Sequence, residues 1–136
     1  MPTKAERAVI ANKVLLLISQ FGRHFFQHDE RVSQFEISAR GHIMLRDAYT
    51  GRLVYTHDRK SRWRGFTEGG TLRDLVCNLA DYIGKDVPIR HRQFGPWPEY
   101  LCDGDLWGYG KEEMAKLREQ LAPYVTFPEA TDAGLR

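Results

Sequence analysis

The sequence has no long hydrophobic run and few cysteines, and each shortage excludes a class of protein. Its longest apolar run, from Val14 to Ile18, is far shorter than the roughly 20 residues that a membrane-spanning helix needs. Its two cysteines, Cys77 and Cys102, lie far apart, without the spacing of a metal site or a disulfide framework. The first residues contain no apolar stretch that leads to a cleavage site. We therefore expect a cytoplasmic protein with no membrane contact.

Charge of one sign is also scarce. The net charge of the 136-residue chain is +2, which is too low for a dedicated nucleic-acid-binding protein unless the cations gather on one face. Hydrophobic residues make up 42% of the chain, which is enough to build a core, and no linker or repeat divides it. These features predict a single domain over residues 1–128, followed by a flexible tail over residues 129–136.

Three segments have the spacing of helices. Thr3 and Glu6 form a capping-box pattern before apolar residues at helical spacing, which predicts a helix over residues 4–21 that Gly22 ends. Gly69-Gly70-Thr71 opens a second helix, with Thr71 and Asp74 as its capping pair, and Gly84 ends it. A third helix is predicted over residues 111–121. Residues 85–109 contain prolines and many aromatic residues, which favours an ordered coil packed on the core.

The segment between the first two helices has the period of strands. Phe35, Ile37 and Ala39 alternate with polar residues, as do Ile43 and Leu45. Turn signals at Asp29-Glu30, Arg40-Gly41 and Thr50-Gly51 separate these strands from their neighbours, and the last strand covers residues 53–56. Phe25-Phe26 is either the end of the first helix or a fourth strand at the sheet edge. The predicted fold is therefore α+β, a small antiparallel meander of three or four strands covered by about three helices.

Two candidate metal sites and one anion site fail on inspection. His24 and His28 would share a metal only on a helix, because on a strand they would lie about 13 Å apart, and further ligands are missing. The calcium-loop pattern that begins at Asp103 has Trp107 and Met114 at positions that need oxygen ligands. Gly69-Gly70-Thr71 lacks the lysine of a phosphate loop, and helix capping explains the same residues. We expect no metal and no cofactor.

Two segments are candidates for partner binding. The first is a basic run with one aromatic residue, which suits contacts to phosphates and stacking on a base; the same run also suits a solvated loop. It consists of Arg59, Lys60, Arg62, Trp63 and Arg64. The second is the aromatic coil, whose side chains serve either as a core or as interface hot spots. Its candidates are Trp97, Tyr100, Trp107 and Tyr109, with Phe94 beside them.

No catalytic set emerges from the remaining reactive residues. Cys77 follows Arg73 by one turn and lies off the apolar stripe of its helix, but a partly buried bystander thiol explains it better than a nucleophile. The five histidines lack a spacing that selects a base and an orienting group. A polar cleft lined by His57 and Asp47 would indicate an enzyme. The sequence therefore leaves enzymatic activity open and leans against it.

Several short sequence motifs, taken together, resemble those of a family of small uncharacterised proteins of bacterial phages and mobile elements. The resemblance covers residues 21–118 and rests on Gly22-Arg23, Phe25-Phe26, Arg40-Gly41, Asp47-Ala48-Tyr49-Thr50, Tyr55-Thr56-His57, Trp63-Arg64-Gly65-Phe66, Gly69-Gly70-Thr71-Leu72, Phe94-Gly95-Pro96-Trp97 and Gly104-Asp105-Leu106-Trp107-Gly108-Tyr109. The resemblance carries no known activity or catalytic residue. It implies a setting in which many small proteins act by binding, including anti-CRISPR inhibitors of host defence.

These observations favour a non-enzymatic accessory protein that binds a host or element protein, with inhibition of a host defence system as one form of that role. The alternative is an accessory nucleic-acid-binding module that uses the basic run at residues 59–64. A small enzyme of unrecognised type is the third hypothesis. The oligomeric state stays open, since a sheet edge or the aromatic coil could pair two copies.

Overall fold

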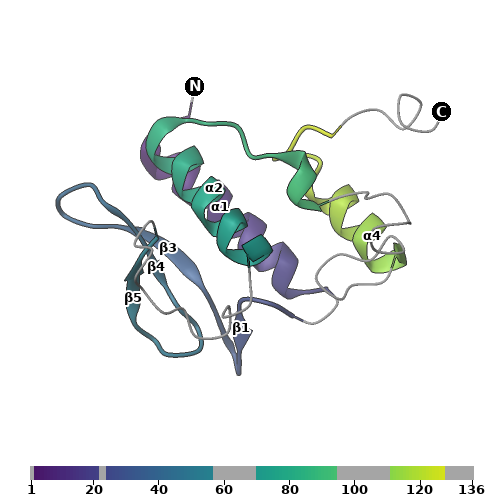
Figure 1. Ribbon diagram of the computed structural model, residues 1–136, viewed down its shortest axis with the longest axis horizontal. Coiled ribbons are helices and arrows are strands. Elements are labelled where there is room, and N and C mark those ends of the chain that lie inside the picture. Colours follow the sequence, from purple (N-terminus) through teal and green to yellow (C-terminus); the bar gives the residue numbers. More distant parts are fainter. Residues whose placement is uncertain (1, 22–23, 57–69, 95–110, 128–136) are drawn as a thin grey trace.

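The computed structural model describes residues 2–21, 24–56, 70–94 and 111–127, and its elements make an α+β fold, as predicted (Figure 1). In chain order they are α1 (Lys4–Ser19), β1 (Gln27–His28), β2 (Arg31–Val32), β3 (Gln34–Ile37), β4 (Ile43–Arg46), β5 (Leu53–Tyr55), α2 (Gly70–Lys85), the 3-10 helix η1 (His91–Phe94) and α4 (Lys111–Leu121).

Helix α1 begins at the predicted capping box. The backbone N–H of Glu6 donates to Thr3 Oγ1 at 3.1 Å, and the backbone N–H of Thr3 donates to Glu6 Oε1 at 2.7 Å. The helix ends at Ser19, two residues earlier than predicted, and the proposed stop Gly22 lies outside the described residues. Its buried residues lie on one side, which packs against α2, α4 and β3, whereas Val9 and Leu16 on the other side are exposed. Helix α1 thus joins the sheet to α2 and α4, while its other side faces solvent.

Strands β3, β4 and β5 form the predicted antiparallel meander. Phe35 pairs with Leu45, and Leu45 pairs with Val54, so these three side chains share the inner face that meets the helices. The two turns predicted within the meander, Arg40-Gly41 and Thr50-Gly51, are both present. In each the glycine has a left-handed backbone, with φ of +86° at Gly41 and +75° at Gly51. Glycine adopts this conformation without steric cost, which explains why the turn signals were reliable.

Neither alternative for Phe25-Phe26, the end of the first helix or a fourth strand, is correct. These residues form a turn, and Phe26 has φ of +71°, which an extended strand excludes. The next residues form a separate two-stranded hairpin, in which Gln27 pairs with Val32 around the predicted Asp29-Glu30 turn. Val32 therefore belongs to this hairpin and not to the meander, whose first strand starts at Gln34. The side chain of Phe26 is fully buried in the core.

Helices α1 and α2 lie antiparallel over the inner face of the sheet, and α4 packs on α1 (Figure 1). Arg7 Nε near the start of α1 donates to the carbonyl oxygen of Ile83 near the end of α2 at 3.0 Å. The predicted apolar stripe of α2 is buried at Leu75, Val76, Leu79, Ala80 and Ile83. The helix begins at Gly70, so Thr71 lies inside it and is not its capping residue as predicted.

The segments after α2 and α4 complete the core. Of the predicted ordered coil, residues 91–94 form η1, and Phe94 is fully buried, as expected for core packing. Helix α4 has the predicted bounds, and Val125 beyond it is also buried. The predicted tail over residues 129–136 lies outside the described residues. No helix in the described parts of the chain combines the length and the apolar character needed to cross a bilayer.

Candidate functional site

The outer face of the three-stranded sheet is defined by the strand register. Arg46 of β4 lies between Gln34 and Leu53, and Met44 lies between Glu36 and Tyr55. Because side chains alternate along a strand, these six residues point away from α1 and α2. Most of them are exposed or half-buried, as expected for a face that the helices do not cover.

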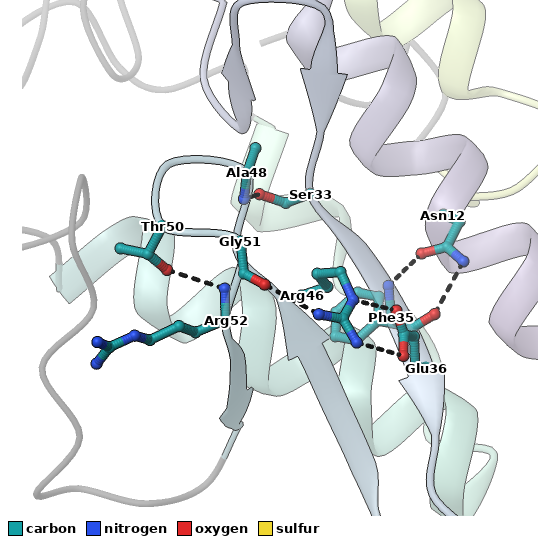
Figure 2. Close-up of polar contacts among 9 residues, drawn as sticks. All are labelled: Asn12, Ser33, Phe35, Glu36, Arg46, Ala48, Thr50, Gly51 and Arg52. Atoms are coloured by element: carbon teal, nitrogen blue, oxygen red, sulfur yellow. Dashed lines mark hydrogen bonds and ion pairs between the residues drawn. The ribbon is translucent and has the colours of Figure 1, made fainter.

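The charged part of this face is paired within the protein (Figure 2). Arg46 donates from Nε to Glu36 Oε2 at 2.6 Å and from Nη2 to Glu36 Oε1 at 3.3 Å, and its Nη1 donates to the carbonyl oxygen of Gly51 at 2.9 Å. The hydrogen bonds to Glu36 raise the pKa of Arg46 above its ordinary value. This bidentate geometry fixes both side chains and leaves little charge for an external ligand.

The rest of the face is apolar and aromatic. The side chains of Leu53 and Tyr55 are 42% and 46% exposed, which is high for large hydrophobic residues two positions apart on one strand. His42 stacks on Tyr55, with ring centroids 5.6 Å apart and planes 22° apart. Met44 pairs with Tyr55 across the two strands. We call His42, Met44, Leu53 and Tyr55 the outer sheet patch.

Asp47, directly after β4, holds a turn through its side chain. It is 2% exposed, its Oδ1 accepts the backbone N–H of Tyr49 at 3.0 Å, and its Oδ2 accepts the hydroxyl of Thr50 at 3.2 Å. The Ser33 hydroxyl accepts the backbone N–H of Ala48, and the Thr50 hydroxyl accepts that of Arg52 (Figure 2). Both carboxylate oxygens of Asp47 are thus used to hold the turn that places β5 beside β4.

The residues that the sequence singled out for partner binding are not placed by the structure. Arg59, Lys60, Arg62, Trp63 and Arg64 lie outside the described residues, as do Trp97, Tyr100, Trp107 and Tyr109. The same holds for His57, Gly69 and the acidic pair Asp103 and Asp105. In the chain, the basic run begins three residues after Thr56, which directly follows the exposed strand β5.

The two histidines considered for a metal site lie in separate local contacts. His24 Nδ1 is 2.8 Å from the carbonyl oxygen of Ser19 at the end of α1. His28 lies beside Tyr49, with ring centroids 5.5 Å apart, and its Nε2 is 3.6 Å from Asp29 Oδ2. Neither a helix nor a strand spans residues 24–28, so neither spacing argument for a shared metal applies. Across the described residues, no three of His, Cys, Asp and Glu form a group suited to a metal ion.

Cys77 has a structural contact. Its thiol Sγ is 3.2 Å from the carbonyl oxygen of Thr56, and the side chain is partly buried between α2 and the end of β5. This contact agrees with a partly buried thiol off the apolar stripe and joins the helix to the last strand of the sheet.

The outer sheet patch was not among the residues selected from the sequence. The strand over residues 53–56 was predicted, but its apolar side chains were not divided between two faces. The sequence pattern that indicates this patch is the run of consecutive apolar residues Leu53, Val54 and Tyr55 on a predicted strand. Successive side chains point to opposite faces, so one buried face leaves at least one of these residues exposed.

Comparison with known proteins gives one match. The chain matches the family model named YoqU over residues 3–136, a wider range than the resemblance noted above. No curated protein and no solved structure is similar enough to the chain to count as a match.

Proposed function

We propose that this chain, which belongs to the YoqU family, is a non-enzymatic accessory protein of a phage or mobile element. It acts by binding a host or element protein, with a component of a host defence system as the proposed target. The resemblance of its sequence phrases to small proteins of phages and mobile elements supports this setting. The outer sheet patch supports binding as the mode of action.

The observation that carries the proposal is the joint exposure of Leu53 and Tyr55 beside Met44 and His42. A flat group of apolar and aromatic side chains on one face is typical of a protein-binding surface. Tyrosine is enriched among residues that contribute most to binding, because its ring buries a large area at a low cost in conformational entropy.

The charges on this face favour a protein partner over a nucleic acid. Among the described strand residues of the outer face, Arg46 carries the positive charge. Glu36 neutralises that charge, with Glu36 Oε2 2.6 Å from Arg46 Nε. Binding to phosphates needs cations that are free to replace counterions. The partner that fits this patch is therefore a protein with a complementary apolar surface of low charge.

The test is affinity capture from a bacterial host lysate with three forms of the full chain, each with and without nuclease treatment. These forms are the unmodified protein, the double variant Leu53→Ser/Tyr55→Ser, and the control Val9→Ser. Val9 is 68% exposed on α1, which covers the inner face of the sheet, so the control removes an exposed apolar side chain elsewhere. The exposed positions of all three residues allow the variants to fold, which thermal unfolding checks.

We expect a protein partner that survives nuclease treatment and binds Val9→Ser as well as the unmodified chain. Recovery with the double variant should fall about tenfold or more. Equal recovery with the double variant would show that the patch is not the binding surface. Nuclease treatment could instead abolish the capture of the partner. If charge reversal at Arg59, Lys60, Arg62 and Arg64 abolished it too, the chain would be shown to bind nucleic acid.

A further inference from the structure

A cavity of about 470 Å³ lies between the end of α2, the segment 88–91 and the segment 124–126. In Figure 1, the chain leaves α2 here and passes towards α4, away from the three-stranded sheet. Its apolar and aromatic lining residues are Pro88, Ile89, Tyr82 and Tyr124. Its volume is in the range of roughly 300–1,000 Å³ that is usual for small-molecule sites.

One wall of this cavity is held in place by a buried asparagine. Asn78 of α2 is 1% exposed, and its Nδ2 donates to the carbonyl oxygen of Pro88 at 3.2 Å. Its Oδ1 accepts the backbone N–H of Arg90 at 2.8 Å. The next residue, His91, meets the ring of Phe127 edge-on, with centroids 6.5 Å apart. The wall is therefore fixed before any ligand arrives, which lowers the entropic cost of binding.

The polar groups of the lining are suited to an anion. The lining residues include two with basic side chains, Arg90 and His91, and three with hydroxyl groups, Tyr82, Tyr124 and Thr126, and none of the described lining residues is acidic. Burial, and then the charge of Asp86, raises the pKa of Tyr82, with Arg7 acting in the opposite direction. The phenol of Tyr82 can donate a hydrogen bond to a ligand.

Arg90 is only loosely engaged within the protein. Its Nη1 is 3.8 Å from Asp74 Oδ2, beyond hydrogen-bonding distance, and the two side chains are 53% and 58% exposed. An exposed ion pair of this kind contributes little to stability, so the guanidinium can turn to a ligand at small cost. Guanidinium groups bind carboxylates and phosphates through two parallel hydrogen bonds.

We propose that this cavity is a binding site for a small aromatic anion. A planar ring lies against Pro88 and the tyrosine side chains, and a carboxylate or phosphate on that ring or its sugar is held by Arg90 and His91. This site is separate from the outer sheet patch. It would give the chain a small-molecule ligand in addition to the protein partner proposed for that patch.

The test is a calorimetric titration of the full chain with four probes. Adenosine 5′-monophosphate and benzoate carry both a ring and an anionic group, whereas adenosine lacks the charge and inorganic phosphate lacks the ring. We expect the first two to bind, and adenosine and phosphate to bind at least about tenfold more weakly.

Variants locate the site. Arg90→Gln should weaken binding of the two aromatic anions about tenfold, and Thr126→Trp, which places a bulky side chain at the rim, should also weaken it. The matched control is Arg52→Gln, an exposed arginine at the turn before β5, which should bind as the unmodified chain does. The double variant Leu53→Ser/Tyr55→Ser should also bind normally, so this result stands apart from that of the sheet patch.

Three outcomes would overturn the proposal. They are no heat of binding with either aromatic anion, equal affinity for adenosine and adenosine 5′-monophosphate, or equal affinity of Arg90→Gln and the unmodified chain. Thermal unfolding of each variant separates a lost ligand contact from a lost fold.

Discussion

The side chain of Asn12 on α1 is bonded to both backbone polar groups of Phe35 on β3. Its Nδ2 donates to the Phe35 carbonyl oxygen at 3.2 Å, and its Oδ1 accepts the Phe35 N–H at 2.6 Å (Figure 2). In the antiparallel ladder, the polar groups of alternate residues point away from the paired strand. Asn12 thus takes the place that a neighbouring strand would have at this point of the sheet.

Replacement of Asn12 by alanine should therefore destabilise the protein strongly. The change leaves two partly buried backbone groups without partners, at a cost of about 2–6 kcal/mol, because each such group costs roughly 1–3 kcal/mol. Urea unfolding followed by circular dichroism measures the loss. The control Lys13→Ala alters an exposed side chain on the next position of α1 and should change stability by less than about 0.5 kcal/mol. Similar values for the two variants would refute a structural role for Asn12.

Two glycine-to-alanine changes should have opposite effects. Gly51 has φ of +75°, so alanine there should cost about 1–2 kcal/mol through backbone strain. Gly84 lies within α2, and a Cβ atom there would meet Ile43 Cγ1 at 3.5 Å, an ordinary contact. Alanine at this position should stabilise the protein by about 0.5–1 kcal/mol, because it restricts the unfolded chain. Thermal unfolding of both variants tests this prediction of opposite effects. A Gly51→Ala variant more stable than the unmodified protein would contradict the prediction.

The capping box should make stability depend on pH in the acid range. Hydrogen bonds, chiefly from the backbone of Thr3, lower the pKa of Glu6 from 4.5. A lowered folded-state pKa contributes stability above 4.5, and this contribution is lost as the pH falls through the folded value. Glu6→Gln keeps the cap but not the charge, so it should be less stable than the unmodified protein at neutral pH. Urea unfolding at about pH 7 and about pH 3 should show this difference shrinking at low pH, and a constant difference would speak against it.

The elements that the sequence predicted well have local causes. The capping pair Thr3 and Glu6 marked the start of α1, and Gly41 and Gly51 marked turns because their left-handed backbone is determined within a few residues. The apolar stripe of α2, and the alternation of Phe35 and Ile37 with polar residues, were visible in the sequence because each element is buried on one side only.

The features that the sequence did not predict depend on distant partners. Phe26 adopts φ of +71° because its ring is buried in the core and its carbonyl oxygen accepts the N–H of Ser33 at 2.7 Å. Its own neighbours contain no signal for that conformation. Asn12 is, in the sequence, one polar residue among the apolar residues of α1, and nothing near it indicates its partner Phe35, which is 23 residues away. The outer sheet patch depends on the faces of three strands, which no single segment reveals.

Helix α1 precedes each of its partners in the chain, and this order has a consequence for biosynthesis. The ribosome makes residues 4–19 before the surfaces that cover them, which come from β3, α2 and α4, the last of which ends at Leu121. Until that residue has emerged, part of an apolar helix stays uncovered, so a nascent chain of this length offers a transient target for chaperones or for aggregation. Helix α1, which packs on β3, α2 and α4, is therefore synthesised before every element that covers it.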